Sequence, residues 1–291
     1  MIGPAGMGKG RVVVLGAGGM LGCDVVAACT KRGFEVRGYD LPEFDITNDE
    51  QLDQAIRSAD AVINCAAYTN VDGAESRREL AYRVNAEAVG RLGRLVADSG
   101  TWVLHFSTDF VFDGGLDRPY AETDTPIPVN EYGRSKLAGE QLLSRSGCSF
   151  SIVRLQWTYG LHGANFVSKI VERARGGGPL RVVDDQVGSP TATTEAAGAA
   201  CMLLERRAEG LFHFAAASCA SRYEVAAFIL ERLSLQTELS PCRSSDYPSP
   251  ARRPLNSRFD CSKIEALLAE PIRSWQGPLA DFVKRLRISD L

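Results

Sequence analysis

The stretch RVVVLGAGGMLG, residues 11–22, joins a short run of β-branched apolar residues to a cluster of glycines. Its first half is typical of a buried β-strand, and the residues that follow, as far as Gly33, predict a helix. The glycines of this turn are spaced G-x-x-G-x-x-G at Gly16, Gly19 and Gly22. Glycines let a chain turn tightly, and the N–H groups at the start of a helix bind phosphate. The stretch therefore predicts the strand–turn–helix unit of a dinucleotide-binding fold.

The same alternation of short apolar runs and helical segments continues along the chain. Further buried strands are predicted at residues 34–40, 60–67, 101–107 and 150–156. Strands that alternate with helices at this spacing predict βαβ units and a parallel sheet covered on both faces. We therefore expect an α/β fold, with a Rossmann-type doubly wound parallel sheet and a smaller C-terminal substrate-binding lobe.

The alternation loosens beyond about residue 160, where Gly- and Pro-rich segments appear. The sequence predicts an NAD(P)-binding core over residues 1–160, in which residues 1–10 form a flexible extension. Residues 161–291 are expected to form mainly the substrate-binding lobe, with some segments returning to the core.

Two of the predicted helices begin with a capping box. In TNDE, residues 47–50, Thr47 is expected to accept from the first turn while Glu50 reaches back, and this helix is predicted to run to about Ser58. A second capping box opens the helix predicted over residues 221–233.

The net charge, the apolar runs and the cysteine spacing limit the partners that we expect for the chain. The chain has 291 residues and a net charge of −3, so we expect no binding to nucleic acid and no attraction to an anionic membrane. The longest apolar run, residues 196–204, is too short to span a bilayer, and the apolar run near the N-terminus is too short for a signal peptide. These two observations predict a cytoplasmic protein. The eight cysteines lack metal-ligand spacing, so we predict no metal.

Asp40 bears on the choice of dinucleotide. It ends the second predicted strand, eighteen residues beyond Gly22. A carboxylate at this place can accept hydrogen bonds from an adenosine ribose and would repel a 2′-phosphate. The cofactor is therefore predicted to be NADH or NADPH, with NADH slightly favoured; the neighbouring Arg37 keeps the second cofactor open.

Tyr132 and Lys136 lie four positions apart in NEYGRSK, residues 130–136, and share one face of a predicted helix. An ammonium beside a phenol favours the phenolate, so we expect Lys136 to lower the pKa of Tyr132 and make it a proton donor near neutral pH. An isolated pair of this kind is more often a packed tyrosine and a solvated lysine. Here the end of a predicted strand at Thr108 supplies a hydroxyl at the edge of the sheet where ligands bind.

Taken together, these motifs resemble the extended short-chain dehydrogenase/reductases, and within them the dTDP-4-dehydrorhamnose reductase family. The stretches that carry the resemblance run through nearly the whole chain: NCAAYTNVDGAE (64–75), STDFVFDG (107–114), EYGRSKLAGE (131–140), VRLQWTYG (153–160), VVDDQVGSPT (182–191) and YPSPARRPLNSRFDCSKI (247–264). This family reduces the C4 ketone of dTDP-4-dehydro-β-L-rhamnose to dTDP-L-rhamnose, a precursor of cell-surface polysaccharide.

The resemblance also implies roles for individual residues. Tyr132 would donate the proton, Lys136 would orient the cofactor and tune Tyr132, and Thr108 would bind the carbonyl oxygen. The implied cofactor-binding positions are Gly16, Gly19, Met20, Leu21, Gly22, Asp40, Asp45, Ile46, Ala66, Ala67, Tyr68 and Lys136. The implied substrate-binding positions are Thr108, Asp109, Trp157, Arg252 and Arg253.

Other interpretations remain open at this stage. A relative of the same fold is a non-catalytic NAD(P)-binding regulatory subunit of methionine adenosyltransferase, and other relatives are reductases or epimerases of another nucleotide sugar. A dehydratase would place an acidic pair after the strand-end threonine, whereas Phe110 follows Asp109 here. The family also often accepts both cofactors. The chain is expected to be a monomer or a homodimer.

Overall fold

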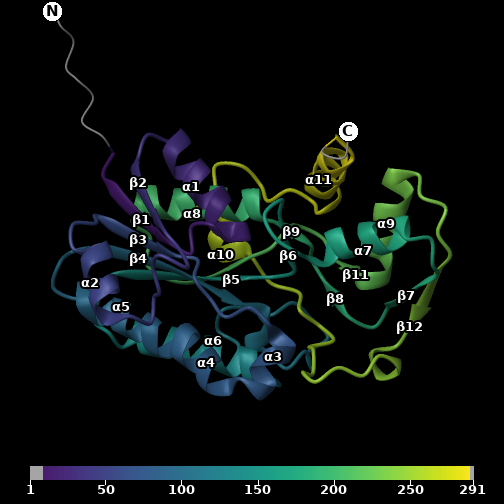
Figure 1. The fold of residues 1–291 in the computed structure, drawn as a ribbon, viewed down its shortest axis with the longest axis horizontal. Coiled ribbons are helices and arrows are strands. Elements are labelled where there is room, and N and C mark those ends of the chain that lie inside the picture. Colours follow the sequence, from purple (N-terminus) through teal and green to yellow (C-terminus); the bar gives the residue numbers. More distant parts are fainter. Residues whose placement is uncertain (1–8, 289–291) are drawn as a thin grey trace, which may run out of the picture.

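The central element of the protein is a six-stranded sheet with the strand order β10-β5-β4-β3-β1-β2 (Figure 1). The computed structural model describes residues 9–288, so most of the predicted N-terminal extension lies outside the described residues. All pairs of neighbouring strands in this sheet are parallel. The strands are β1 (Arg11–Leu15), β2 (Glu35–Tyr39), β3 (Ala61–Asn64), β4 (Trp102–Thr108), β5 (Phe150–Leu155) and β10 (Gly210–Phe214).

Helices cover both faces of this sheet, as Figure 1 shows. On one face lie α1 (Met20–Lys31) and α8 (Thr193–Arg206). The opposite face carries α2 (Asp49–Ile56), α5 (Ala88–Val96) and α6 (Glu131–Ser144). Alternate side chains of β1 explain the two layers, because Val12 and Val14 pack with α1 and α8 whereas Val13 and Leu15 pack with α2 and α5. The prediction of a doubly wound, Rossmann-type α/β fold is confirmed.

The remaining elements of the first half connect these layers. Between β3 and α5 the chain forms α3 (Val71–Ser76), α4 (Arg78–Tyr82) and a π-helical turn, η1 (Arg83–Glu87). A 3₁₀ turn, η2 (Asp109–Val111), follows β4 directly.

A second hydrophobic core lies in the C-terminal half, beside the sheet (Figure 1). Its helices are α7 (Phe166–Arg175), α9 (Arg222–Leu233) and α11 (Gln276–Ile288). Short strands pair around it as β6 (Thr158–Tyr159) with β9 (Thr191–Ala192), β7 (Leu180–Val183) with β12 (Leu239–Cys242), and β8 (Val187–Gly188) with β11 (Ala220–Ser221). The remaining elements, which precede α11 in the sequence, are the turn η3 (Ser244–Asp246) and α10 (Ser262–Glu265). Between these segments, α8 and β10 belong to the layers of the main sheet.

The two predicted capping boxes have different outcomes. The one at Thr47 is wrong, because Asn48 caps α2 and its side chain accepts from the N–H groups of Glu50 and Gln51, each at 3.1 Å. The Thr47 hydroxyl instead donates to Asp45 at 2.8 Å. Helix α2 also ends at Ile56, before the predicted limit. The second capping box is confirmed at the start of α9.

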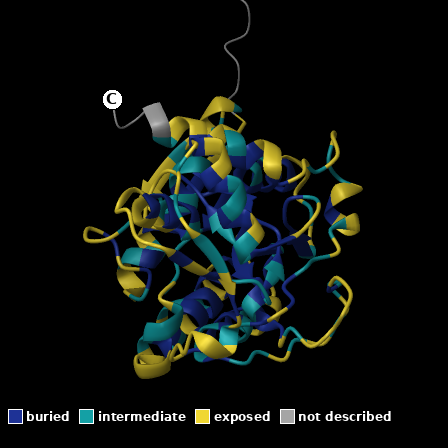
Figure 2. Cartoon of the chain, turned by 90° about the vertical axis from the view of Figure 1, so that its right-hand side faces the viewer, coloured by how far each residue is buried: buried dark blue, intermediate teal, exposed yellow. Residues whose placement is uncertain are grey.

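Burial follows the layers of the fold, with buried residues concentrated between sheet and helices (Figure 2). Within residues 9–288, none of the helices has the length and apolar character needed to cross a membrane. Several polar side chains are nevertheless fully buried in the sheet, and they include Asn64, His105 and His213. Buried polar groups need hydrogen-bond partners, so we expect each of these side chains to bond to a neighbouring residue.

Candidate active site

The carboxyl ends of five neighbouring strands bring the predicted site residues to one edge of the sheet. Gly16 follows β1, Asp40 follows β2, Ala66 lies two residues beyond β3, Thr108 ends β4 and Trp157 lies two residues beyond β5. Because these strands are parallel, their carboxyl ends share an edge. The chain runs from β1 to β2 on one side and returns to β3 on the other, and ligands of open α/β sheets bind at such a reversal.

The glycine turn is packed closely against the loop that follows β3. Gly16 has φ of +75°, and a Cβ there would lie 2.6 Å from the backbone nitrogen of Ala66. Helix α1 begins at Met20, and its cap, Gly19, supplies no side-chain hydrogen bond to the first turn. The N–H groups at the start of α1 therefore have no side-chain cap of their own, which suits a phosphate-bearing ligand.

Asp40 is bound to this turn. One carboxylate oxygen accepts from the Gly18 N–H at 2.7 Å and the other accepts from the Leu41 N–H at 2.8 Å. A carboxylate has about four lone-pair sites, so both oxygens can still accept from a hydroxyl. Asp40 thus places a negative charge directly beside the turn.

The other predicted cofactor positions lie mostly in the segments that follow β2 and β3. Ile46 is buried, and the Asp45 carboxylate accepts from the Thr47 backbone at 2.8 Å. Beyond β3, the Ala66 N–H donates to Asn64 at 3.0 Å and the Tyr68 N–H donates to Asn85 at 2.8 Å. Ala67 lies in the segment after β3, whereas Leu21 and Gly22 lie in α1. The backbone on both sides of the β1 end is therefore held by specific hydrogen bonds.

Thr108, Asp109 and Tyr132 form the centre of the site. The Thr108 hydroxyl lies 3.0 Å from Asp109 Oδ1, and a hydrogen bond with Thr108 lowers the pKa of Tyr132. Tyr132 is half-buried, and its ring meets Phe110 edge-on with centroids 5.7 Å apart. Asn130 caps α6 by accepting from the Gly133 N–H at 2.8 Å, which fixes the first turn that carries Tyr132.

The pKa of Tyr132 differs from the sequence-based expectation. Burial, opposed by the hydrogen bond with Thr108 and supported by the charge of Asp109, raises this pKa to about 12. The expected lowering by Lys136 is wrong for this structure, because the Lys136 amine donates to the Phe106 carbonyl at 2.6 Å and lies 3.2 Å from a ring nitrogen of His105. Burial also lowers the pKa of Lys136 to about 8.

Trp157 and Arg222 close the far side of the site from the C-terminal half. Trp157 has φ of +43°, a conformation that is costly for a bulky residue and is often found at functional sites. Its indole packs on Gly188, where a Cβ would lie 2.6 Å from the ring. The Arg222 guanidinium lies 3.5 Å from the centre of the indole, a close cation–π contact. Arg222 also lowers the pKa of the buried Asp109, which burial raises.

The basic loop of residues 247–258 reaches the start of α6. The Arg252 carbonyl accepts from Asn130 Nδ2 at 2.7 Å, and the Arg252 side chain is exposed. Arg253 instead forms an ion pair with Asp72 at 2.9 Å and lowers the pKa of that carboxyl group. The two arginines therefore differ in their availability for a diphosphate.

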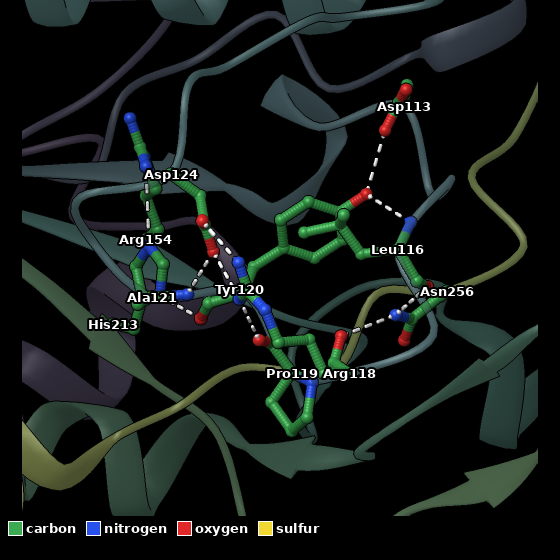
Figure 3. Close-up of polar contacts among 10 residues, drawn as sticks. All are labelled: Asp113, Leu116, Arg118, Pro119, Tyr120, Ala121, Asp124, Arg154, His213 and Asn256. Carbon is green, nitrogen blue, oxygen red and sulfur yellow. Dashed lines mark hydrogen bonds and ion pairs between the residues drawn. The ribbon is translucent and has the colours of Figure 1, made fainter.

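The segment between η2 and α6 is fastened to the same late loop (Figure 3). The Tyr120 hydroxyl donates to Asp113 at 2.7 Å, and Asn256 Nδ2 donates to the carbonyl groups of Leu116 at 2.7 Å and Arg118 at 2.8 Å. The two Asn256 contacts join segments that are 140 and 138 positions apart in the sequence.

Sequence reasoning did not identify three residues of this site: Asn64, His105 and Arg222. The second capping box places Arg222 at the first position of a helix, but no sequence pattern indicates that this helix start faces Trp157. A signal did exist for His105, because it is a polar residue inside the apolar strand TWVLHFS. Within residues 9–288 we find no cluster of His, Cys, Asp and Glu that could hold a metal ion.

Known proteins resemble this chain in sequence and in fold. A family model described as the RmlD substrate binding domain matches residues 10–288. Over 278 residues, the chain is 38% identical to a dTDP-4-dehydrorhamnose reductase of Mycolicibacterium smegmatis, covering 94% of this chain and 85% of the relative.

The chain belongs to the dTDP-4-dehydrorhamnose reductase family. This confirms the resemblance inferred from the sequence and places the chain in a family of oxidoreductases. A dTDP-4-dehydrorhamnose reductase of Clostridium acetobutylicum superposes with a TM-score of 0.91 at 31% identity, covering 95% of this chain and 99% of that one. The enzyme of Bacillus anthracis, solved in complex with NADP, gives the same values.

Proposed function

We propose that this family member reduces the C4 ketone of dTDP-4-dehydro-β-L-rhamnose to dTDP-L-rhamnose with a reduced nicotinamide dinucleotide. The observation that carries the proposal is the contact between Thr108 and Tyr132 at the carboxyl edge of the sheet, beside the glycine turn. Two hydroxyl groups that converge at this point suit a carbonyl oxygen that must be bound and then protonated.

The side chains present supply the acid of this reaction. A reductase needs its proton donor in the protonated form, and the pKa of Tyr132, raised to about 12, keeps the phenol neutral at physiological pH. Tyr132 then donates its proton to the carbonyl oxygen while Thr108 binds that oxygen. The bound dinucleotide supplies the hydride. Thr108 also stabilises the phenolate that remains, because its hydrogen bond favours the charged form.

The cofactor is assigned to the glycine turn and the residues around it. Gly16, Gly19, Met20, Leu21 and Gly22 would hold the pyrophosphate, and Asp45, Ile46, Ala66, Ala67 and Tyr68 would flank the remainder. Asp40 would bind the adenosine ribose. Its charge lies against Gly18 and would repel a 2′-phosphate, so we propose a modest preference for NADH.

The sugar nucleotide is assigned to the opposite wall. The indole face of Trp157 suits the apolar side of a 6-deoxyhexose. Asp109 would bind a sugar hydroxyl, because its Oδ2 is buried without a protein partner. We assign the diphosphate to Arg252, whose side chain is exposed, more than to Arg253, whose charge is already paired with Asp72.

The test is the loss of reduced-nicotinamide absorbance with dTDP-4-dehydro-β-L-rhamnose generated in situ, with NADH and NADPH compared at equal concentrations. We expect rapid oxidation that depends on the sugar nucleotide and is faster with NADH. Tight dinucleotide binding without turnover would contradict the proposal and favour a non-catalytic binding protein. Turnover with a different 4-keto nucleotide sugar alone would overturn the substrate assignment.

A further inference from the structure

Arg222, the first residue of α9, brings a positive charge to the site from the C-terminal half. Its backbone N–H donates to the Gln186 carbonyl at 3.2 Å, which fixes the start of the helix. The guanidinium carbon lies 3.5 Å from the centre of the Trp157 indole and 4.8 Å from the centre of the Phe166 ring. Two aromatic rings from separate segments therefore hold this half-buried side chain in place.

These ring contacts do not use the hydrogen-bond donors of Arg222. A cation–π contact involves the flat face of the guanidinium, whereas its N–H groups point outward in the plane of the group. Within residues 9–288, the structure shows no hydrogen bond and no ion pair from this guanidinium to a protein oxygen. Its donors therefore remain able to bind acceptor atoms of a ligand.

The acidic side chains close to Arg222 have other partners. Glu224 follows it in the first turn of α9, but the Glu224 carboxylate accepts from the Ser221 N–H at 2.6 Å as part of the capping box. The charge of Asp109 attracts Arg222, although Asp109 Oδ1 lies 3.0 Å from the Thr108 hydroxyl and forms no ion pair with the guanidinium. Neither acid therefore neutralises Arg222.

The charge around Arg222 is consequently unbalanced. Burial lowers its pKa to about 9, the charge of Asp109 opposes this lowering, and the charge of Arg253 adds to it. Arg222 is thus still a cation at neutral pH. An anion beside it would supply the missing negative charge, and a guanidinium matches the oxygens of a phosphate group in particular.

The position of Arg222 decides which of the two phosphate-bearing ligands it can bind. The dinucleotide pyrophosphate is assigned to the glycine turn after β1. Arg222 instead lies against Trp157, beyond β5, and β3 and β4 separate β5 from β1 by roughly 14 Å. The charges that act on Arg222 belong to Asp109, assigned to the sugar, and to Arg253 of the basic loop. Arg222 is therefore on the side of the sugar nucleotide.

We propose that Arg222 is a substrate-binding residue whose guanidinium, held against Trp157 and Phe166, binds the diphosphate of the sugar nucleotide. This inference rests on the proposed function, which requires a dTDP-sugar. The diphosphate is then bound from two directions, by Arg222 on α9 and by the exposed Arg252 of the basic loop.

The first test is calorimetric titration of dTDP into the protein saturated with oxidised dinucleotide, comparing the wild type with Arg222→Met. Methionine keeps an apolar side chain against the indole and removes the charge and the donors. We expect dTDP to bind at least about tenfold more weakly, as for the loss of a hydrogen bond between charged groups. The affinity for the dinucleotide should stay within about twofold of the wild type, because the glycine turn is unchanged.

Arg232→Met is the matched control. Arg232 lies on the same helix, is exposed, and its guanidinium lies 4.9 Å from the centre of the Phe228 ring. This variant also loses a cation–π contact of α9, but away from the site, so the affinity for dTDP should not change. Equal weakening in the two variants would attribute the effect to packing of α9 and contradict the role of Arg222.

The second test is a crystal structure of the wild-type protein with dTDP, which decides the question even where Arg222→Met does not fold. We expect an Arg222 nitrogen at about 2.7–2.9 Å from a phosphate oxygen. A diphosphate bound by the basic loop alone, or an unchanged dTDP affinity in Arg222→Met, would overturn the role of Arg222 and leave the proposed function standing. Failure of the wild-type protein to bind dTDP at millimolar concentration would instead refute the proposed function itself.

Discussion

Two buried histidines lie beside buried basic side chains on either side of β5, and the polar groups around the two rings differ. His213 on β10 lies next to Arg154, with Nδ1 2.9 Å from the Tyr120 carbonyl and Nε2 3.3 Å from the guanidinium (Figure 3). A carbonyl accepts and a guanidinium only donates, so Nδ1 carries the proton. At His105 on β4, the neighbours are the Asn64 amide nitrogen, 3.1 Å from Nδ1, and the Lys136 amine, 3.2 Å from Nε2.

The two basic side chains differ in whether they can lose their charge. Arginine keeps its charge in proteins, so its histidine must accept, and the site has a single protonation state. A buried lysine can lose its proton, and burial lowers the pKa of Lys136 to about 8, so the charge of this site can change with pH. We call the Lys136–His105 pair the adjustable site, and Arg154 with His213 and Glu140 the fixed site. Lys136 and Glu140 lie one turn apart on α6, so a single helix contributes to both sites.

The largest effect is expected at the adjustable site, from Tyr132→Phe. Phenylalanine keeps the edge-on packing against Phe110 and removes only the hydroxyl. Turnover should fall by about 10²–10⁴-fold because the proton donor is gone. Dinucleotide binding and the melting temperature should stay near the wild-type values. Turnover within tenfold of the wild type would remove Tyr132 from its proposed role and weaken the contrast between the two sites.

The next largest effect is expected at the fixed site, from Glu140→Gln. Glu140 and Arg154 are both almost fully buried, and the variant leaves the guanidinium charge without its counter-ion. Breaking such a pair costs about 3–5 kcal/mol in the free energy of unfolding. The measurement is urea unfolding followed by circular dichroism.

Asp53→Asn is the matched control for Glu140→Gln, because Asp53 pairs with Arg57 on the exposed side of α2. We expect its effect on unfolding to be below about 0.5 kcal/mol. Similar losses in the two variants would show that burial does not distinguish the Glu140 pair from a surface pair.

The smallest effect is the change of folding stability with pH, which arises because both buried histidines have a lowered pKa. Burial lowers the pKa of His213 to about 3 and that of His105 well below 6.5. Below about pH 6.5 the unfolded chain binds protons that the folded protein excludes, so stability is complete above this pH and falls as pH decreases. Each histidine contributes a slope of up to about 1.4 kcal/mol per pH unit.

Unfolding free energies at pH 7.5, 6.5 and 5.5 test this expectation. In His213→Gln the change of the unfolding free energy with pH between pH 6.5 and pH 5.5 should decrease by up to about 1.4 kcal/mol per pH unit. The exposed His162→Gln should leave the slope unchanged. An unchanged slope in His213→Gln would mean that His213 is charged in the folded protein.

Several features of the site could be predicted from local sequence. The apolar run at residues 11–16 and its glycines are sufficient for a strand, a tight turn and a helix, because backbone conformation and hydrophobic periodicity act over short distances. The spacing of Tyr132 and Lys136 likewise places them on one face of α6. The capping of α2 was less predictable, since Thr47 and Asn48 are adjacent residues that can both cap a helix.

The protonation states were decided by the tertiary structure. Nothing in NEYGRSK indicates that Lys136 meets His105, which lies 31 positions earlier, or that Asn64 contacts the other nitrogen of that ring. The contact of Arg222 with Trp157 likewise joins distant segments. A pKa depends on burial and on the partners that folding brings close. The sequence alone therefore determined the fold and the common face of Tyr132 and Lys136, whereas the contacts and pKa values of these residues arose only when the strands and helices packed together.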